Sequence, residues 1–234
     1  MENSEETAIE HVEFVYSSAN RILHWIRAVM ITALAITGFY IASPFLAPGE
    51  SSDQLIYANW VYWHLVFGFI LIAGALLRIY LFFFGVNSTG ELLSLKDVSS
   101  VQSWKIALKS YFFIGELNKK GMYGPLHFMS YFMITVFIVL ASVTGLILYV
   151  HVYHQGLGGL LYEPMRVLES WMGGLAMVRL LHHITMWGFL IFIPIHIYMV
   201  IWSAIRFKHA ALDVMFTGYD YHLMKDKHNK YEDK

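Results

Sequence analysis

The sequence of 234 residues contains no cysteine, and only 14% of its residues are charged. Without cysteine the chain forms no disulfide and holds no thiolate-ligated iron–sulfur cluster, so any such cluster belongs to another protein. A soluble domain carries about 25% charged residues, so this chain is too poor in charge for a water-exposed globule. Its net charge of −1 also excludes the strong basic field of a nucleic-acid-binding protein.

Hydrophobic residues make up 57% of the chain and gather in four long segments. About 20 apolar residues in a helix cross the hydrocarbon core of a bilayer, and in lipid the backbone must satisfy its own hydrogen bonds. The segments predict one all-α domain over 1–234, an integral membrane four-helix bundle. Its helices are expected at about 18–43, 59–84, 126–150 and 179–206, followed by a tail over 207–234.

The distribution of lysine and arginine predicts the orientation of this bundle. The loop 44–58 contains Glu50 and Asp53 but no lysine or arginine, whereas the loop between the second and third helices and the C-terminal tail are rich in lysine. Basic residues favour the cytoplasmic side. Both termini are therefore expected in the cytoplasm of a bacterial cell, with the protein in the inner membrane and the loop 151–179 outside.

The second loop also contains a helical pattern. Its apolar residues recur at helical spacing, at Trp104, Leu108, Tyr111 and Phe112. Lys105 and Lys109 lie between them. This pattern is typical of a short amphipathic helix that lies in the membrane interface.

Four histidines lie in the expected spans, at His24, His64, His182 and His196. His182 and His196 are 14 residues apart, which is about 1400° of helix, within about 40° of a whole number of turns, and about 21 Å of rise. They therefore leave one helix face near opposite sides of the bilayer. At matching depths His64 faces His182 outside, and His24 faces His196 towards the cytoplasm. Imidazoles on both sides of an iron are typical of electron-transfer haems, so the pattern predicts two b-type haems.

Two alternatives bear on these ligands. His183 competes with His182, but it precedes His196 by 13 residues and so points about 140° away, towards a helix contact or a haem propionate. A single histidine in a membrane helix can instead bond a neighbouring helix, which four histidines at paired depths disfavour. The inner pair matches less well in depth, and a first helix that begins near Ser18 reduces the mismatch.

Haem propionates need cations or donors near the headgroup region. Arg179 is adjacent to His182, and Arg78 follows His64 by 14 residues on the same helix face. The alternative for each arginine is ordinary snorkelling towards the interface. The expected propionate contacts are Arg21, Arg27, Arg78, Arg179, Arg206 and His183.

Two stretches carry a family resemblance. Arg21-Ile22-Leu23-His24-Trp25 with Thr37-Gly38, and Arg179-Leu180-Leu181-His182-His183-Ile184 with Trp187, Phe189, Phe192 and His196, resemble the first and fourth helices of b-type cytochrome subunits of membrane-bound nickel–iron hydrogenases. Chain length and helix number are also similar. The resemblance implies a periplasmic hydrogenase partner, with a membrane-anchored iron–sulfur small subunit and through it a large subunit where H₂ is split. It is compatible with oligomers of the whole complex.

The resemblance also implies a substrate and a route. Electrons would enter at the outer haem (His64/His182), pass to the inner haem (His24/His196) and reduce menaquinone or ubiquinone. In related cytochromes the quinone lies near the segment that leads into the third helix, where this chain has Tyr123, Gly124 and His127. Relatives often have asparagine in place of Gly124. His127 or Tyr123 would then act as hydrogen-bond donor or proton relay, and the alternative for His127 is an ordinary interfacial side chain.

Three other functions stay open at this point. The same bundle serves formate dehydrogenases and thiosulfate reductases, although the fourth-helix pattern favours hydrogenase. A free-standing dihaem quinol oxidoreductase or ferric reductase needs no soluble partner. A haem-free membrane anchor would need no histidine pairs.

Overall fold

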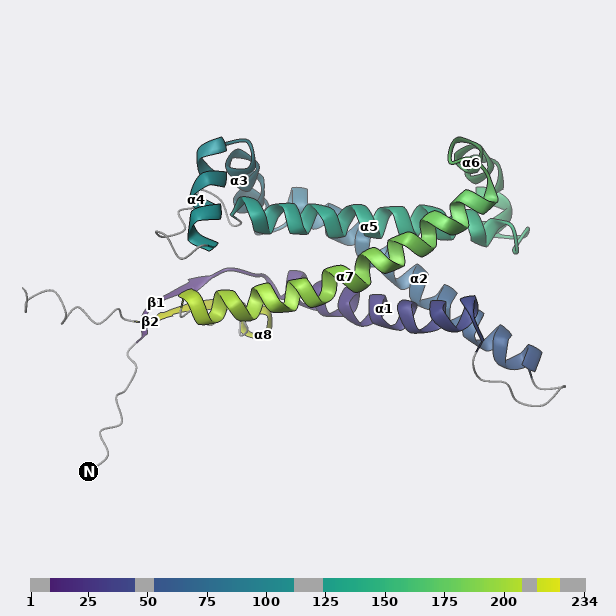
Figure 1. The fold of residues 1–234 in the computed structure, drawn as a ribbon, viewed down its shortest axis with the longest axis horizontal. Coiled ribbons are helices and arrows are strands. Elements are labelled where there is room, and N and C mark those ends of the chain that lie inside the picture. Colours follow the sequence, from purple (N-terminus) through teal and green to yellow (C-terminus); the bar gives the residue numbers. More distant parts are fainter. Residues whose placement is uncertain (1–8, 45–52, 112–123, 208–213, 224–234) are drawn as a thin grey trace, which may run out of the picture.

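The computed structural model describes residues 9–44, 53–111, 124–207 and 214–223 (Figure 1). Four of its helices are long and apolar enough to cross a membrane: α1 (Ser18–Ala42), α2 (Asp53–Phe84), α5 (Pro125–Val150) and α7 (Leu175–Phe207). In the bundle α1 packs against α2, α2 against α5, and α5 against α7. The predicted all-α membrane bundle is confirmed, with one two-stranded pairing added to it.

Local signals explain where these helices begin. The Ser17 hydroxyl accepts a hydrogen bond from the Asn20 backbone N–H (3.4 Å) and so caps α1. Pro125 begins α5, a position where its missing N–H is not needed. α2 begins at Asp53 rather than 59, and α7 at Leu175 rather than 179. The added residues of α2, at 53–58, are of mixed polarity, whereas those of α7, at 175–178, are apolar and simply precede Arg179.

A central apolar layer separates the two ends of the bundle. Its buried side chains come one from each spanning helix: Ile31, Leu71, Ile138 and Phe189. Phe137 packs edge-on against Phe189 with ring centroids 5.7 Å apart. Phe189 lies midway in sequence between His182 and His196, so the layer lies between the two histidine levels.

One end of the bundle, here called the strand end, gathers elements that are distant in sequence (Figure 1). They are β1 (Ile9–Phe14), α3 (Ser88–Val98), α4 (Val101–Tyr111), α8 (Val214–Thr217) and β2 (Tyr219–Leu223). β1 and β2 pair antiparallel. Asn87 connects the segment after β1 to the start of α1. Its Oδ1 accepts hydrogen bonds from the Ser17 N–H (3.2 Å) and from Asn20 Nδ2 (3.1 Å), and its Nδ2 donates to the Val15 carbonyl (2.7 Å).

The second loop forms two helices where the sequence predicts one. α4 is the predicted helix, but its buried face consists of the small residues Ser103, Ala107 and Ser110, while Leu108 is half-exposed. α3 was not predicted, because the side chains that it buries include Glu91 and Ser94 and so give no apolar periodicity. Phe112 lies outside the described residues.

At the opposite end, here called the α6 end, α6 (Leu157–Trp171) follows α5 (Figure 1). The glycines at 156, 158 and 159 predict only a turn there. In the structure they start the helix: Gly156 has φ of 57°, and a Cβ at Gly158 would lie 1.8 Å from the Tyr153 carbonyl oxygen. Glu169 of α6 accepts hydrogen bonds from His151 (2.6 Å) and Arg166 (2.8 Å), which fastens α6 to the end of α5.

We expect this attachment of α6 to weaken in acid. The hydrogen bond from His151, with the charges of His151 and Arg166, holds the pKa of Glu169 below its ordinary value. A depressed carboxyl pKa stabilises the folded state fully above the unfolded pKa, and that stability is lost as pH falls through the folded value. The protection factors of the α6 amides, which correct for the intrinsic slowing of exchange in acid, should therefore fall below about pH 4. At neutral pH Glu169→Gln should accelerate the exchange of these amides by at least about tenfold.

The matched control is Glu163→Gln on the exposed side of the same helix. Exchange in α6 should stay at the wild-type rate in that variant. Equal exchange in Glu169→Gln and wild type would show that the ion pair does not hold the helix.

Candidate functional site

The four predicted histidines form two facing pairs. The rings of His64 (α2) and His182 (α7) have centroids 6.3 Å apart with their planes at 69°. The rings of His24 (α1) and His196 (α7) also have centroids 6.3 Å apart, with planes at 48°. The first pair is called here the α6-end pair and the second the strand-end pair. Helix α7 contributes to both, at positions about 21 Å apart along its axis.

The pair separation fits a metal ion held between two imidazoles. A metal–imidazole nitrogen bond is about 2.0 Å, as at zinc sites, and the ring centroid lies about 1 Å behind the nitrogen, so imidazoles on opposite sides of a metal have centroids about 6 Å apart. Both pairs have this separation. Within the described ranges no cluster of three or more His, Asp or Glu side chains is arranged to hold a metal. The donor sets are thus pairs of imidazoles, which suit haem iron.

Threonine hydroxyls hold the rings of the α6-end pair. Thr37 Oγ1 of α1 lies 2.8 Å from His64 Nδ1, and Thr144 Oγ1 of α5 lies 2.8 Å from His182 Nδ1. Each hydroxyl also donates its proton to a carbonyl of its own helix, to Ala33 (2.8 Å) or to Leu140 (2.6 Å). With that proton on the carbonyl, Nδ1–H of each imidazole is the donor to threonine, and the backbone carbonyl of Leu34 or Ala141 is a second acceptor beside it. The lone pair of each Nε2 is then available for a metal.

A glycine follows each of these threonines and gives the rings room. A Cβ at Gly38 would lie 3.4 Å from His64 Cε1, and one at Gly145 would lie 3.5 Å from His182 Cε1. An alanine Cβ at either position would meet the imidazole at an ordinary van der Waals distance, and a larger side chain would press on the ring.

The strand-end pair has aromatic neighbours instead. Phe192 stacks on His196 with centroids 5.7 Å apart and planes at 11°. Trp25 lies edge-on to His24, and its Nε1 donates to the Met215 carbonyl (3.1 Å). In the part of the chain that the structure describes, neither ring of this pair has a hydrogen-bond partner. Packing alone orients these two imidazoles.

His183 lies apart from both pairs. It is exposed on α7, whereas its neighbour His182 is turned towards His64. The alternative assignment of His183 as the ligand therefore has no facing partner among the described residues.

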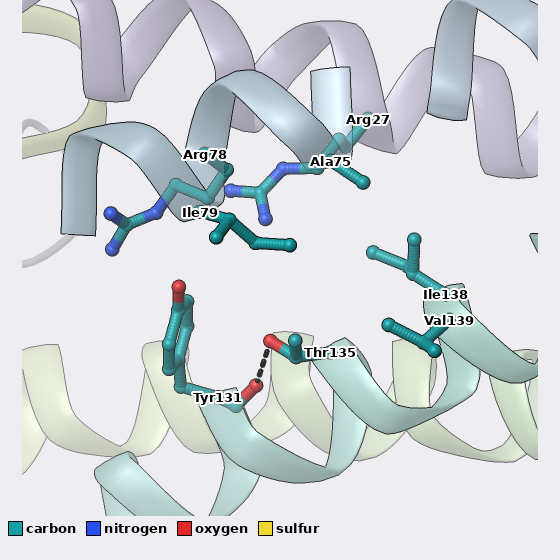
Figure 2. Close-up of a pocket in the computed structure, with 8 residues that line it drawn as sticks. All are labelled: Arg27, Ala75, Arg78, Ile79, Tyr131, Thr135, Ile138 and Val139. Atoms are coloured by element: carbon teal, nitrogen blue, oxygen red, sulfur yellow. Dashed lines mark hydrogen bonds between the residues drawn. The ribbon is translucent and has the colours of Figure 1, made fainter. Parts of the chain in front are cut away.

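Two arginines line a pocket between α1, α2 and α5. Figure 2 shows the guanidinium groups of Arg27 and Arg78 facing Tyr131 and Thr135 across this pocket. Arg78 is buried, bonds Glu91 of α3 (2.8 Å) and lies over the Tyr131 ring at 5.0 Å. Arg27 is one turn beyond His24 on α1 and donates to the Leu23 carbonyl (3.1 Å). The pocket therefore offers cations near the level of the strand-end pair.

The other predicted contact residues are more scattered. Arg21 donates to the Phe216 carbonyl and to the Ser18 hydroxyl (3.1 Å), and Arg179 is exposed near the start of α7. Gly124 is the N-cap of α5, and His127 is exposed in its first turn. Tyr123 and the side chain of Arg206 lie outside the described residues.

Sequence reasoning missed Thr144, Tyr131 and Glu91. A signal for Thr144 exists, because the dipeptide Thr144-Gly145 repeats Thr37-Gly38 in another span. Nothing comparable distinguishes Tyr131 among 15 tyrosines. Glu91 lies in the second loop, where nothing in the sequence distinguishes a buried carboxylate from an exposed one.

The sequence is similar to those of known proteins. Residues 15–218 match the model of a family described as prokaryotic cytochrome b561. A probable Ni/Fe-hydrogenase B-type cytochrome subunit of Rhizobium leguminosarum bv. viciae is 30% identical over 91% of each chain. One of Rhodobacter capsulatus is 29% identical over 88% of this chain and 80% of its own length. A probable Ni/Fe-hydrogenase 1 B-type cytochrome subunit of Escherichia coli K12 is 24% identical over 98% of this chain and 99% of its own.

These matches confirm the resemblance that the first and fourth spans predict. They cover every spanning helix and both histidine pairs, and the apolar helices make the chain a multi-pass membrane protein. The chain belongs to the prokaryotic cytochrome b561 family, a family of haem-binding b-type cytochromes.

Proposed function

We propose that this chain is a dihaem cytochrome b subunit that passes electrons from a periplasmic [NiFe] hydrogenase across the membrane to quinone. The observation that carries the proposal is the presence of two facing histidine pairs with the same 6.3 Å separation. The names of the relatives support the hydrogenase partner.

The histidines supply the ligands. When bound, haem b contributes reversible one-electron transfer. His64 and His182 present one Nε2 from each side at the α6 end, and His24 and His196 do the same at the strand end. With an imidazole from each side, the bound group would supply electron transfer and would bind no substrate at its metal.

The charges of the loops give the route its direction. Lysines lie in α3, α4 and the C-terminal tail, which supports a cytoplasmic strand end with α6 on the outside. Electrons from the iron–sulfur small subunit would thus enter at the α6-end pair and leave from the strand-end pair. The central apolar layer keeps water out of the space between the two levels.

The quinone is proposed to bind at the strand end. Gly124 and His127 begin α5 there, and Tyr123 precedes them in the chain. The exposed imidazole of His127 is suited to donate a proton to a quinone oxygen. Arg27 and Arg78 are the best-placed cations for propionates of the inner haem, and Arg179 and His183 lie at the outer end.

Reconstitution of the complex in liposomes tests this function. The purified complex should contain two b-type haems per copy of this chain, co-purify with hydrogenase subunits, and reduce a quinone when H₂ is supplied. If the quinol takes its protons from the cytoplasmic side, turnover should also generate a membrane potential. Co-purification with a formate dehydrogenase or thiosulfate reductase, or absence of a b-type spectrum, would contradict the proposal.

A further inference from the structure

The two histidine pairs differ in their hydrogen bonding. Both rings of the α6-end pair donate Nδ1–H to a buried threonine, Thr37 or Thr144. Both rings of the strand-end pair lack such a partner among the described residues and are held by Phe192 and Trp25. The asymmetry is complete, because it applies to both ligands of each pair.

A hydrogen bond from Nδ1–H changes the iron as well as the ring position. It increases the electron density on the imidazole and makes Nε2 a stronger base. A more basic ligand stabilises the more positive, oxidised iron and lowers its reduction potential. Two such bonds act together at the α6-end pair, and the apolar surroundings of the bundle strengthen each of them.

We propose that Thr37 and Thr144 lower the reduction potential of the iron centre between His64 and His182 below that of the centre between His24 and His196. The inference rests on the proposed function and deepens it. An electron from the partner's reduced iron–sulfur cluster would reduce the outer centre, and transfer inward would oxidise that centre and reduce the inner one. The quinone would then remove the electron, so each transfer has a donor and an acceptor.

A charge near the strand-end pair acts in the same direction. Arg27 lies one turn from His24 on α1, and Arg78 lines the same pocket as Arg27 (Figure 2). A nearby cation favours the reduced, less positive state of an iron centre and so raises its potential. The charge of Arg78 is balanced by Glu91, so the cation that counts is Arg27. The hydroxyls at one end and the Arg27 guanidinium at the other therefore both favour electron flow towards the strand end.

Redox titration of the haem bands in the intact complex tests the proposal. Thr37→Val and Thr144→Val keep the shape of the side chain and remove the hydroxyl. Each should raise the potential of one component, so that its ratio of reduced to oxidised iron at a fixed potential rises by up to about tenfold, and the double variant should raise it further. The other component should not move. His182→Ala identifies which component belongs to the outer centre, because the component that remains is the inner one.

Two controls separate the hydrogen bond from packing. Thr37→Ser and Thr144→Ser keep the hydroxyl and should keep the wild-type potentials. Thr32→Val removes a hydroxyl of α1 that donates to the Ala28 carbonyl of the same helix (2.9 Å), and should change neither component. Serine variants that shift as far as the valine variants would overturn the proposal.

The outcomes also distinguish this inference from the function on which it rests. A wild-type complex without two bis-histidine haems would contradict the proposed function. A complex with both haems, whose potentials stay unchanged in the double valine variant or whose inner component shifts instead, would contradict only the role of the threonines.

Discussion

Replacing His182 by alanine should remove one haem per chain and leave the other in place. His182 faces His64 at 6.3 Å, so the variant would leave a haem iron at this pair with a single imidazole. The strand-end pair lies about 21 Å away along α7 and keeps both of its ligands. The ratio of haem to protein should fall by half, and the reduced b-type band should lose one of two components. Quinone reduction with H₂ should fall by several orders of magnitude, because the electron route is interrupted.

His183→Ala is the matched control for this change. It removes an imidazole from the adjacent position on the same helix, but that ring is exposed and faces no partner in the described chain. Two haems should remain. If His183→Ala lost a haem and His182→Ala kept both, the assignment of the ligand would be wrong.

The histidine pairing could be predicted from the sequence because it depends on helix geometry alone. Once four spans are recognised, the spacing from His182 to His196 determines the shared face, and the chain direction determines which of His24 and His64 has the matching depth. The structure places His64 opposite His182 and His24 opposite His196. The early start of α1 at Ser18 brings His24 deep enough to face His196.

The groups around the histidines could not be predicted in the same way. Thr37 and Thr144 contact rings on other helices, so their role depends on how helices pack and not on a period within one segment. α3 escaped prediction because its buried residues include the polar Glu91 and Ser94. α6 escaped it because the glycines at 156, 158 and 159 indicate a turn, although Leu157, Leu161 and Leu168 recur at helical spacing. β1 and β2 are separated by about 200 residues of sequence, and no local sequence pattern predicts that they pair.

Glu91 is the carboxylate that balances the charge of Arg78 inside the bundle. Its side chain is fully buried at 0% exposure, and it bonds the buried Arg78 at 2.8 Å. The pair joins α3 to α2 and holds the guanidinium beside Tyr131. The strand end therefore depends on this pair both for its packing and for the position of the Arg78 charge.

Glu91→Ala should destabilise the protein by about 3–5 kcal/mol, because it leaves the charge of Arg78 buried without its carboxylate. Thermal unfolding in detergent, followed by loss of the haem spectrum, measures this effect. Arg78→Met with Glu91→Leu removes both charges and should recover most of the stability, since the cost comes from the unpaired ion and not from the lost pair. Glu163→Ala, which truncates an exposed glutamate on α6, should have little effect. If the double variant were as unstable as Glu91→Ala, the shape of the side chains and not their charge would hold α3 against the bundle.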